Sequence, residues 1–293
     1  HERAVLEMGM YALGEIALLC DIARPQIGVV TNVGPVHLER LGSMERIVQA
    51  KAELVQALPE DGLAILNGDD RRVRAMAGRT EAALLTFGLG PENIVWADEI
   101  VSHGLEGVSF TAHVRKGAFA KGVGAFSPST TSHPLYTPML GLPAVMSSLA
   151  AVAAGLSQGL SWEEIERGLA IGGEDLRLVP RRGIRDTTLL DDTYNASPES
   201  VMAALDLLAE LPGRHVAVLG DMLELGAYEQ EGHREVGRYA VGLLDALVTV
   251  GERGRLIAEG AREGGFDDAQ LYAASDNEEA LAIVREIVTS GDA

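Results

Sequence analysis

The 293-residue sequence is poor in the residues that mark several classes of protein. It has one cysteine, Cys20, which excludes an internal disulfide framework or a cysteine zinc cluster and favours a reducing compartment. Its lysines are limited to Lys51, Lys116 and Lys121, and 24 basic against 43 acidic residues give a net charge of −19. Because phosphate backbones attract clustered Lys and Arg, we expect no nucleic-acid partner.

Long apolar runs and a signal peptide are also missing. No run approaches the ~18 consecutive apolar residues of a membrane span, and HERAVLEMGM lacks the charged-then-apolar order of a signal peptide. We therefore expect a soluble, cytoplasmic protein without a membrane partner, with Cys20 as a buried core thiol. His1 is not an initiator methionine, which indicates a chain processed or cut from something longer.

Strand-like apolar runs alternate with helical patterns, which indicates an α/β fold with a mostly parallel sheet. The segment GGEDLRLVPRRG predicts a boundary between a first domain, residues 1–173, and a second, residues 174–293. In the first domain we predict strands at 3–7, 27–32 and 63–66, helices at 13–22, 44–58, 144–156 and 162–170, short β-like runs LLTFG, NIVWA and GVSFTAHV, and a loop at 116–134. In the second we predict strands at 187–190, 215–219 and 246–250, and helices at 200–211, 229–243, 255–263 and 277–288.

Helix starts carry recognisable caps. Ser43 is a plausible N-cap of the helix at 44–58, and Ser161 with Glu164 three residues later has the spacing of a capping box. A glycine-rich phosphate loop is missing, since neither G-x-x-x-x-G-K-[ST] nor G-x-G-x-x-G occurs. The chain by itself should not bind a nucleotide triphosphate through a lysine-bearing loop.

Polar residues follow the predicted strands, and the carboxyl ends of such strands collect ligands in open α/β sheets. For NGDD (67–70) local turn chemistry is the favoured interpretation. For Glu7 and His37 we favour function, because a carboxylate and an imidazole on neighbouring strand ends could share one cation. His233 lies on a predicted helix, where orienting the loop LGDMLELG is at least as plausible as catalysis.

The motifs EMGM (7–10), TNVGPVHLE (31–39), NGDD, DDTYNASP (191–198) and LGDMLELG (219–226) together resemble the Mur ligase family, in the family's order and through nearly the whole chain. Several of them are similar to the member that adds D-alanyl-D-alanine to UDP-N-acetylmuramoyl-tripeptide. The resemblance implies a partial central ATPase domain with a mostly parallel sheet, starting after the phosphate loop. A C-terminal Rossmann-like α/β domain, slightly truncated at its end, follows.

The activity implied by the resemblance is ATP-dependent amide formation in peptidoglycan precursor synthesis, through an acyl phosphate, with ATP, UDP-N-acetylmuramoyl-tripeptide and D-Ala-D-Ala as substrates. We expect a monomer, and we expect this chain alone to be inactive and to bind ATP weakly or not at all. The third peptide residue, diaminopimelate or lysine, stays open. Alternatives are a non-catalytic substrate-binding module and another Mur-type amide ligase.

The resemblance also implies roles for single residues. Glu7 and His37 match magnesium ligands, and Lys51 matches a lysine that carbon dioxide converts to a carbamate ligand for Mg²⁺. The implied catalytic residues are Lys51, His37 and Asp192. The implied ATP-binding residues are Arg177, Asp192 and Ser147, of which Ser147 replaces an asparagine and lacks its adenine-contacting amide. The implied substrate-binding residues are Tyr194, Asn195, Ser197, Asp221, Glu224 and Leu225.

Overall fold

The computed structural model describes residues 1–35, 37–115, 130–171 and 178–293. By its internal contacts the chain divides into two compact units. The first comprises His1–His103, Val108–Pro138 and Leu142–Ile171. The second contains Gly104–Gly107, Met139–Gly141 and the C-terminal part of the chain. Among the described residues, no helix has both the length and the apolar character needed to cross a membrane.

Six strands in the described part of the first unit form one sheet in the order β1-β2-β3-β4-β5-β6. The first four strands run parallel to their neighbours, whereas β4-β5 and β5-β6 are antiparallel pairs. The predicted α/β class with a mostly parallel sheet is confirmed. The strands are β1 (Ile27–Val30), β2 (Leu63–Asn67), β3 (Ala83–Gly88), β4 (Val95–Ser102), β5 (Val108–Arg115) and β6 (Thr130–Thr137). The helices are α1 (Glu15–Ala23), α2 (Leu38–Leu41), α3 (Met44–Gln56), α4 (Arg71–Arg74), α5 (Gly141–Ser157) and α6 (Trp162–Ile171).

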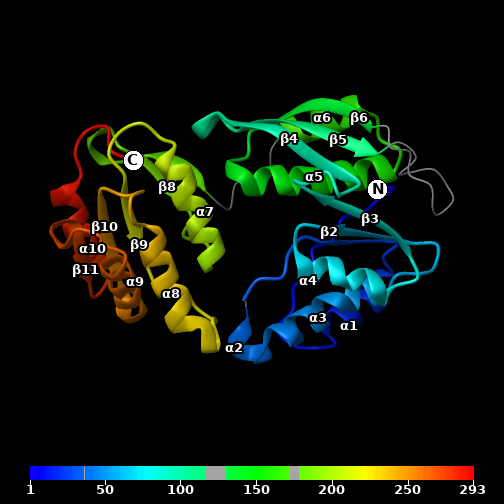
Figure 1. The fold of residues 1–293 in the computed structure, drawn as a ribbon, viewed down its shortest axis with the longest axis horizontal. Coiled ribbons are helices and arrows are strands. Elements are labelled where there is room, and N and C mark those ends of the chain that lie inside the picture. Colours follow the sequence, from blue (N-terminus) through cyan, green and yellow to red (C-terminus); the bar gives the residue numbers. More distant parts are fainter. Residues whose placement is uncertain (36, 116–129, 172–177) are drawn as a thin grey trace. The chain divides into compact units, whose positions relative to one another are not determined.

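Helices cover both faces of this sheet. Figure 1 shows α1, α3 and α4 on one side of β2 and β3, and α5 on the other. On the α5 side, Val145 and Leu149 pack with Ile65, Phe87 and Phe110 in one buried cluster. A strand flanked by helices on both faces must be apolar on both, which explains why β2 is buried along nearly its whole length.

The predicted caps are present at two helix starts. The Ser43 side chain accepts a hydrogen bond from Arg46 N, and this bond fixes the first turn of α3. Ser161 and Glu164 form the capping box, since Ser161 N donates to Glu164 Oε2 at 2.8 Å and Glu164 N donates to Ser161 Oγ at 3.3 Å. Local sequence therefore specifies where these helices begin.

Two predicted segments of the first unit differ from the structure. Residues 1–10 form no strand, so the predicted strand at 3–7 is wrong. No strand pairs with this segment in the described residues, and Val5 is fully exposed. The loop predicted at 116–134 is wrong at its end, because 130–134 belong to β6 and pair with β5. Residues 116–129 lie outside the described part of the chain.

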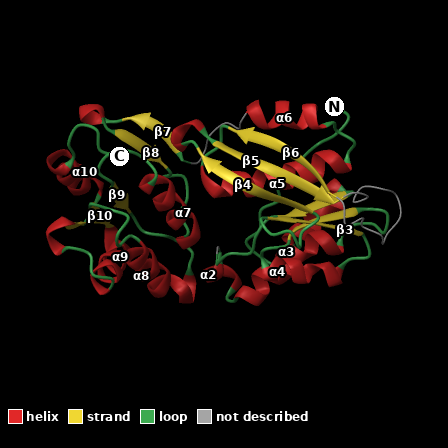
Figure 2. Cartoon of the chain, turned by 45° about the horizontal axis from the view of Figure 1, so that its top comes forward, coloured by secondary structure: helices red, strands yellow, loops and turns green. Residues whose placement is uncertain are grey.

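The second unit holds a parallel three-stranded sheet and an antiparallel pair among its described residues. Its inner strand β10 (Ala246–Val250) places Leu247 in a cluster with the helices α7 (Pro198–Ala209), α8 (Glu229–Tyr239) and α9 (Gly251–Glu263). The next residue of the strand, Val248, lies in a cluster with α10 (Asn277–Ile287). Successive side chains of a strand point to opposite faces, so helices cover both faces of this sheet as well (Figure 2). The three-stranded sheet consists of β9 (Val216–Leu219), β10 (Ala246–Val250) and β11 (Leu271–Ala274), in the order β11-β10-β9. The antiparallel pair consists of β7 (Val179–Arg182) and β8 (Thr188–Asp191). The helices are α7 (Pro198–Ala209), α8 (Glu229–Tyr239), α9 (Gly251–Glu263) and α10 (Asn277–Ile287).

Helices α8 and α9 touch at two glycines. A Cβ atom added to Gly237 would lie 1.9 Å from the carbonyl oxygen of Ile257, and one added to Gly260 would lie 2.1 Å from that of Arg234. Any side chain at these positions would force the backbones apart. Salt bridges flank the contact, with Arg234 Nη2 2.6 Å from Glu259 Oε2. The two helices therefore pack backbone to backbone.

A buried histidine ties the loop after β9 to α8. His233 is fully buried, its Nε2 accepts a hydrogen bond from Met222 N at 3.0 Å, and its Nδ1 lies 2.6 Å from the Glu229 carbonyl oxygen. Because Nε2 accepts, the proton resides on Nδ1 and the ring is neutral. Burial lowers the pKa of His233, although the nearby Glu229 and Asp221 partly oppose this effect. The structure thus supports the loop-orienting role.

We expect His233→Gln to reduce the pH dependence of unfolding. The unfolded histidine titrates near ~6.5 and the folded one lower, so wild type loses stability as pH falls through that window. At pH 7.5 the variant should be less stable by about 1–3 kcal/mol, because the Met222 amide loses its partner. Urea unfolding should show that the difference in unfolding free energy between wild type and variant is smaller at pH 5.5 than at pH 7.5.

The matched control is His103→Gln, which makes the same replacement at an exposed histidine and leaves the Met222 amide its partner. A stability gap between wild type and His233→Gln that stays equal at both pH values would contradict the neutral, buried state of this ring.

Candidate active site

The loop that follows β1, residues 31–35 (the TNVGP loop), is held through its backbone by three side chains. Asn67 Nδ2 at the end of β2 donates to the Thr31 carbonyl oxygen at 2.7 Å. Lys51 Nζ on α3 donates to the Asn32 carbonyl oxygen at 2.7 Å, and Val33 N donates to Asp70 Oδ2 at 2.7 Å. Three backbone groups in two consecutive peptide units are thereby held by side chains of β2, α3 and the N-cap of α4.

The NGDD segment is the structural centre of this arrangement. Asp70 also accepts from the backbone amides of Arg72 at 2.8 Å and Val73 at 3.2 Å, and so caps α4. Asp69 accepts from Leu89 N at 2.6 Å and from Asn93 Nδ2 at 2.8 Å, which links the ends of β2 and β3. The local bonds from Arg72 and Val73 fit the turn interpretation of this motif, whereas the bonds to Val33, Leu89 and Asn93 join it to distant parts of the chain.

Lys51 is the ionisable side chain whose environment is most unusual here. Burial lowers the pKa of its ammonium group, and the negative charge of Asp70 opposes part of that effect. Beyond the Asn32 carbonyl, its Nζ lies 3.4 Å from Asn32 Oδ1. A lysine with a lowered pKa exists more often as the free amine, which is the nucleophilic form.

His37 lies at the N-cap of α2 in a left-handed backbone conformation, with φ of 60°. Its ring meets the Tyr11 ring edge to face, with centroids 4.8 Å apart and an interplanar angle of 72°. The Arg40 guanidinium carbon lies 4.7 Å from the centroid of the same Tyr11 ring. Tyr11 is a residue that the motifs did not single out, because no spacing rule connects residues 11 and 37. Its aromatic contact fixes one side of the imidazole.

Glu7 lies in the segment before α1 that has no regular secondary structure, and it is exposed. The prediction that Glu7 and His37 occupy neighbouring strand ends is therefore wrong. The segment is anchored near α1, where Met8 Sδ lies 3.9 Å from Cys20 Sγ. Cys20 is buried as predicted, and burial raises the pKa of its thiol.

The donor types near the TNVGP loop suit Mg²⁺, which binds carboxylate oxygens and retains water and substrate phosphate ligands. Among the described residues, however, no three His, Cys, Asp or Glu side chains cluster closely enough to hold a metal ion.

In the second unit, the DDTYNASP segment joins β8 to α7. Ser197 caps α7 by accepting from Ser200 N at 3.3 Å, and it forms a capping box with that residue. Asp192 Oδ1 accepts from Leu178 N at 3.4 Å. Tyr194 is 73% exposed and Asn195 is exposed as well, so these two side chains are available to a ligand.

The loop LGDMLELG is fixed at both ends. Asp221 Oδ1 accepts from the amides of Arg253 and Gly254, both at 3.0 Å, and so caps α9. Glu224 adopts a left-handed conformation with φ of 64°. Leu225 is 1% exposed and belongs to the hydrophobic core, so its side chain packs inward and holds the loop in place.

Of the other two residues predicted to bind ATP, the structure describes Ser147 but not Arg177. Ser147 is exposed on α5. Arg177 lies outside the described residues. The structure therefore assembles Lys51, Asn67 and Asp70 on the TNVGP loop, and His37 with Tyr11, within the first unit. Tyr194, Asn195, Asp221 and Glu224 lie on two loops of the second unit.

Comparison with known proteins gives a consistent result along the chain. Residues 1–155 match the Mur ligase middle domain, and residues 176–293 match the Mur ligase glutamate ligase domain. The UDP-N-acetylmuramoyl-tripeptide--D-alanyl-D-alanine ligase of Bacillus subtilis is 36% identical over 298 residues, which cover 99% of this chain and 60% of that protein. The ligase of the same name from Escherichia coli is 32% identical over 90% of this chain and 56% of its own length.

Solved structures agree with this. A crystal structure of MurF from Acinetobacter baumannii superposes with a TM-score of 0.85 at 28% identity, covering 100% of this chain and 61% of that one. MurF from Thermotoga maritima in complex with ADP superposes with a TM-score of 0.77 at 26% identity, over 98% of this chain and 62% of that one. The chain spans about three fifths of the length of the curated relatives it matches. With both of its matched regions in one family, the chain belongs to the Mur ligases.

Proposed function

We propose that this chain supplies the middle and C-terminal parts of an ATP-dependent ligase that adds D-Ala-D-Ala to UDP-N-acetylmuramoyl-tripeptide, a step of peptidoglycan precursor synthesis. The observation that carries the proposal is the 36% identity to the Bacillus subtilis ligase of that name across 99% of the chain. In this proposal residues 1–173 form the ATPase-type domain, and residues 174–293 contact the incoming substrate and ATP. We place the protein in the cytoplasm, on the basis of its single buried cysteine, and we propose that it acts as a monomer.

The proposed reaction has two steps. The carboxylate of the tripeptide attacks the γ-phosphorus of ATP, so that an acyl phosphate forms and ADP leaves. The amine of D-Ala-D-Ala then attacks the acyl carbon, loses a proton, and the tetrahedral intermediate expels inorganic phosphate to give the amide. Because anionic groups meet in the first step, positive charge has to be focused there. Bound Mg²⁺ would supply that charge.

The roles proposed for the first unit follow from the TNVGP loop. Glu7 and His37 would provide metal ligands, with Tyr11 holding the His37 ring in orientation. Lys51, in its carbamate form, would provide an anionic oxygen ligand. Forming the carbamate requires a neutral amine, which attacks carbon dioxide and releases a proton. The lowered pKa of Lys51 and its fixed position over Asn32 favour this modification.

The roles proposed for the second unit divide between contact and support. Tyr194 and Asn195, which are exposed, would contact the substrates directly. Asp192 would reach ATP together with Arg177 and Ser147. Glu224 would contribute to the dipeptide pocket, whereas Ser197, Asp221 and Leu225 would shape it through the helix caps and core packing that they provide.

The proposed activity is tested with a chimaera that joins this chain to the part of the Bacillus subtilis ligase that it does not cover. We expect phosphate release from ATP that requires both UDP-N-acetylmuramoyl-tripeptide and D-Ala-D-Ala, with formation of the pentapeptide product. Lys51→Ala should lower the rate about 100-fold or more, since an interaction with developing charge is lost. Added acetate should restore part of it, because a small carboxylate can occupy the place of the carbamate.

Lys116→Ala serves as the matched control, and it should keep the parental rate. A chimaera with native circular dichroism and a cooperative thermal transition that makes no product would refute the proposed reaction. Full activity of Lys51→Ala would remove the ligand role from this residue.

The modification itself can be detected on the chain without any assay of activity. With ¹³C-labelled bicarbonate, ¹³C NMR should show a carbamate signal that Lys51→Arg abolishes and that Lys116→Arg and Lys121→Arg retain. Because the pKa of Lys51 is lowered, the free amine is populated at lower pH than for an ordinary lysine. The signal should therefore grow as pH rises. Its persistence in Lys51→Arg would assign the carbamate to another amine.

A further inference from the structure

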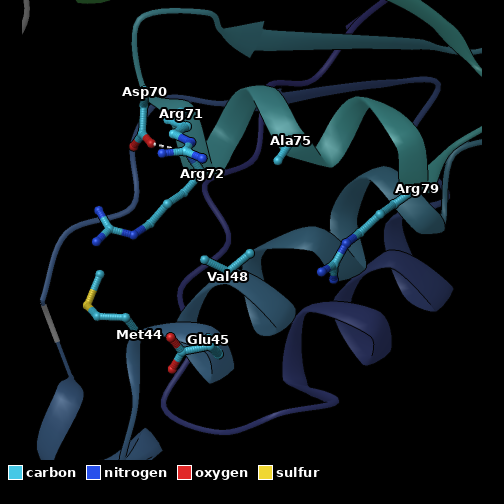
Figure 3. A pocket seen from close by; sticks show the side chains of 8 residues that line it. All are labelled: Met44, Glu45, Val48, Asp70, Arg71, Arg72, Ala75 and Arg79. Atoms are coloured by element: carbon cyan, nitrogen blue, oxygen red, sulfur yellow. Dashed lines mark hydrogen bonds between the residues drawn. The ribbon is translucent and has the colours of Figure 1, made fainter.

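A cavity of about 560 Å³ lies between α3 and the segment formed by α4 and the following short helix, Ala75–Arg79. Figure 3 shows Arg72 and Arg79 at opposite ends of this cavity, with Val48 and Ala75 between them. A volume of this size is typical of small-molecule sites, which are commonly ~300–1,000 Å³. The lining residues are Met44, Glu45, Val48, Asp70, Arg71, Arg72, Ala75 and Arg79.

The arginines that line the cavity form no salt bridge within the described part of the chain, although the charge of Arg72 acts on the nearby Glu45. Among the described residues, no acidic side chain lies within salt-bridge distance of Arg71, Arg72 or Arg79. In the second unit, by contrast, many arginines are paired. Those in salt bridges are Arg181, Arg182, Arg214, Arg234, Arg238, Arg253 and Arg262. The cavity thus brings three exposed arginines without a salt bridge to any described residue together in a chain with a net charge of −19.

The two carboxylates that line the cavity are already engaged. Asp70 accepts hydrogen bonds from three backbone amides, those of Val33, Arg72 and Val73. Hydrogen bonds from its own amide and from Ser43 hold the pKa of Glu45 below its usual range, with a smaller contribution from Arg72. These bonds satisfy the acids locally and leave the guanidinium N–H groups facing the cavity unpaired.

We propose that this cavity is a binding site for a small dianion whose acidic groups are phosphates or carboxylates. A guanidinium group can bind a phosphate or a carboxylate with two parallel hydrogen bonds. Arg72 and Arg79, at opposite ends of the cavity, can each hold one of two separate acidic groups. Val48, Met44 and Ala75 provide an apolar surface for the body of such a ligand. Nothing in this assignment depends on the ligase reaction.

Asp70 connects this site to the TNVGP loop. The same carboxyl group lines the cavity, caps α4 and accepts the Val33 amide. A dianion bound by Arg71 and Arg72 would therefore lie on the helix turn that Asp70 caps, next to the carboxyl group that holds the Val33 amide.

The test is isothermal titration calorimetry of the 293-residue chain at constant ionic strength, with inorganic pyrophosphate and glutarate as probes. We expect saturable binding of at least one of them at one site. Arg72→Ala and Arg79→Ala should each weaken it about tenfold or more, since each removes charge-assisted hydrogen bonds. Preference for pyrophosphate would identify phosphate groups as the natural ligand chemistry, and preference for glutarate would identify carboxylates.

Arg74→Ala is the matched control. Arg74 is exposed on the same helix but does not line the cavity, so the substitution removes the same charge outside the proposed site. It should change affinity less than twofold. Binding of neither probe, or an equal loss with Arg74→Ala, would overturn the proposal. The variants alter exposed side chains, and unchanged circular dichroism confirms that a loss of binding is not a loss of fold.

Discussion

The first unit depends on the way three side chains hold the backbone of the TNVGP loop. A loop after a parallel strand has backbone N–H and C=O groups with no partner in the sheet. Here Asn67, Lys51 and Asp70 satisfy three such groups in two adjacent peptide units. The hydrogen bond between Lys51 Nζ and the Asn32 carbonyl oxygen fixes the position of the Lys51 amine relative to the loop. It also explains why Lys51 is partly desolvated and has a lowered pKa.

The motifs of this family combine support and chemistry within a few residues. In DDTYNASP, Ser197 caps a helix while Tyr194 is open to solvent. In LGDMLELG, Asp221 caps α9 and Leu225 fills the core. A motif match therefore identifies a region, and the hydrogen bonds and burial of each residue then separate those that can touch a substrate from those that hold the loop.

Local signals in the sequence predicted much of the fold. The serine caps of α3 and α6 and the alternation of strands and helices are determined by neighbouring residues, and the structure has them. The failures involve pairing over long distances. The apolar segment at 3–7 resembles a strand but no strand of the described chain pairs with it, and 130–134 looks like a loop but pairs with β5.

The same limit applies to the site. Lys51 and the NGDD segment were recognisable as motif residues, yet the bond from Asp70 to Val33 joins positions that no periodicity relates. The contact of Tyr11 with His37 is equally invisible in the sequence, since it depends on the left-handed turn at His37. The arginine cavity arises from two helices whose packing no local pattern encodes.

The glycine contact between α8 and α9 has a mechanical consequence for the loop LGDMLELG. One side of that loop is bound to α8 through His233, and another is bound to the start of α9 through Asp221. Since the helices meet backbone to backbone at Gly237 and Gly260, they cannot slide or tilt independently without a steric clash. The loop is thus attached to two helices that are held rigidly together, and a displacement of the loop requires both helices to move with it.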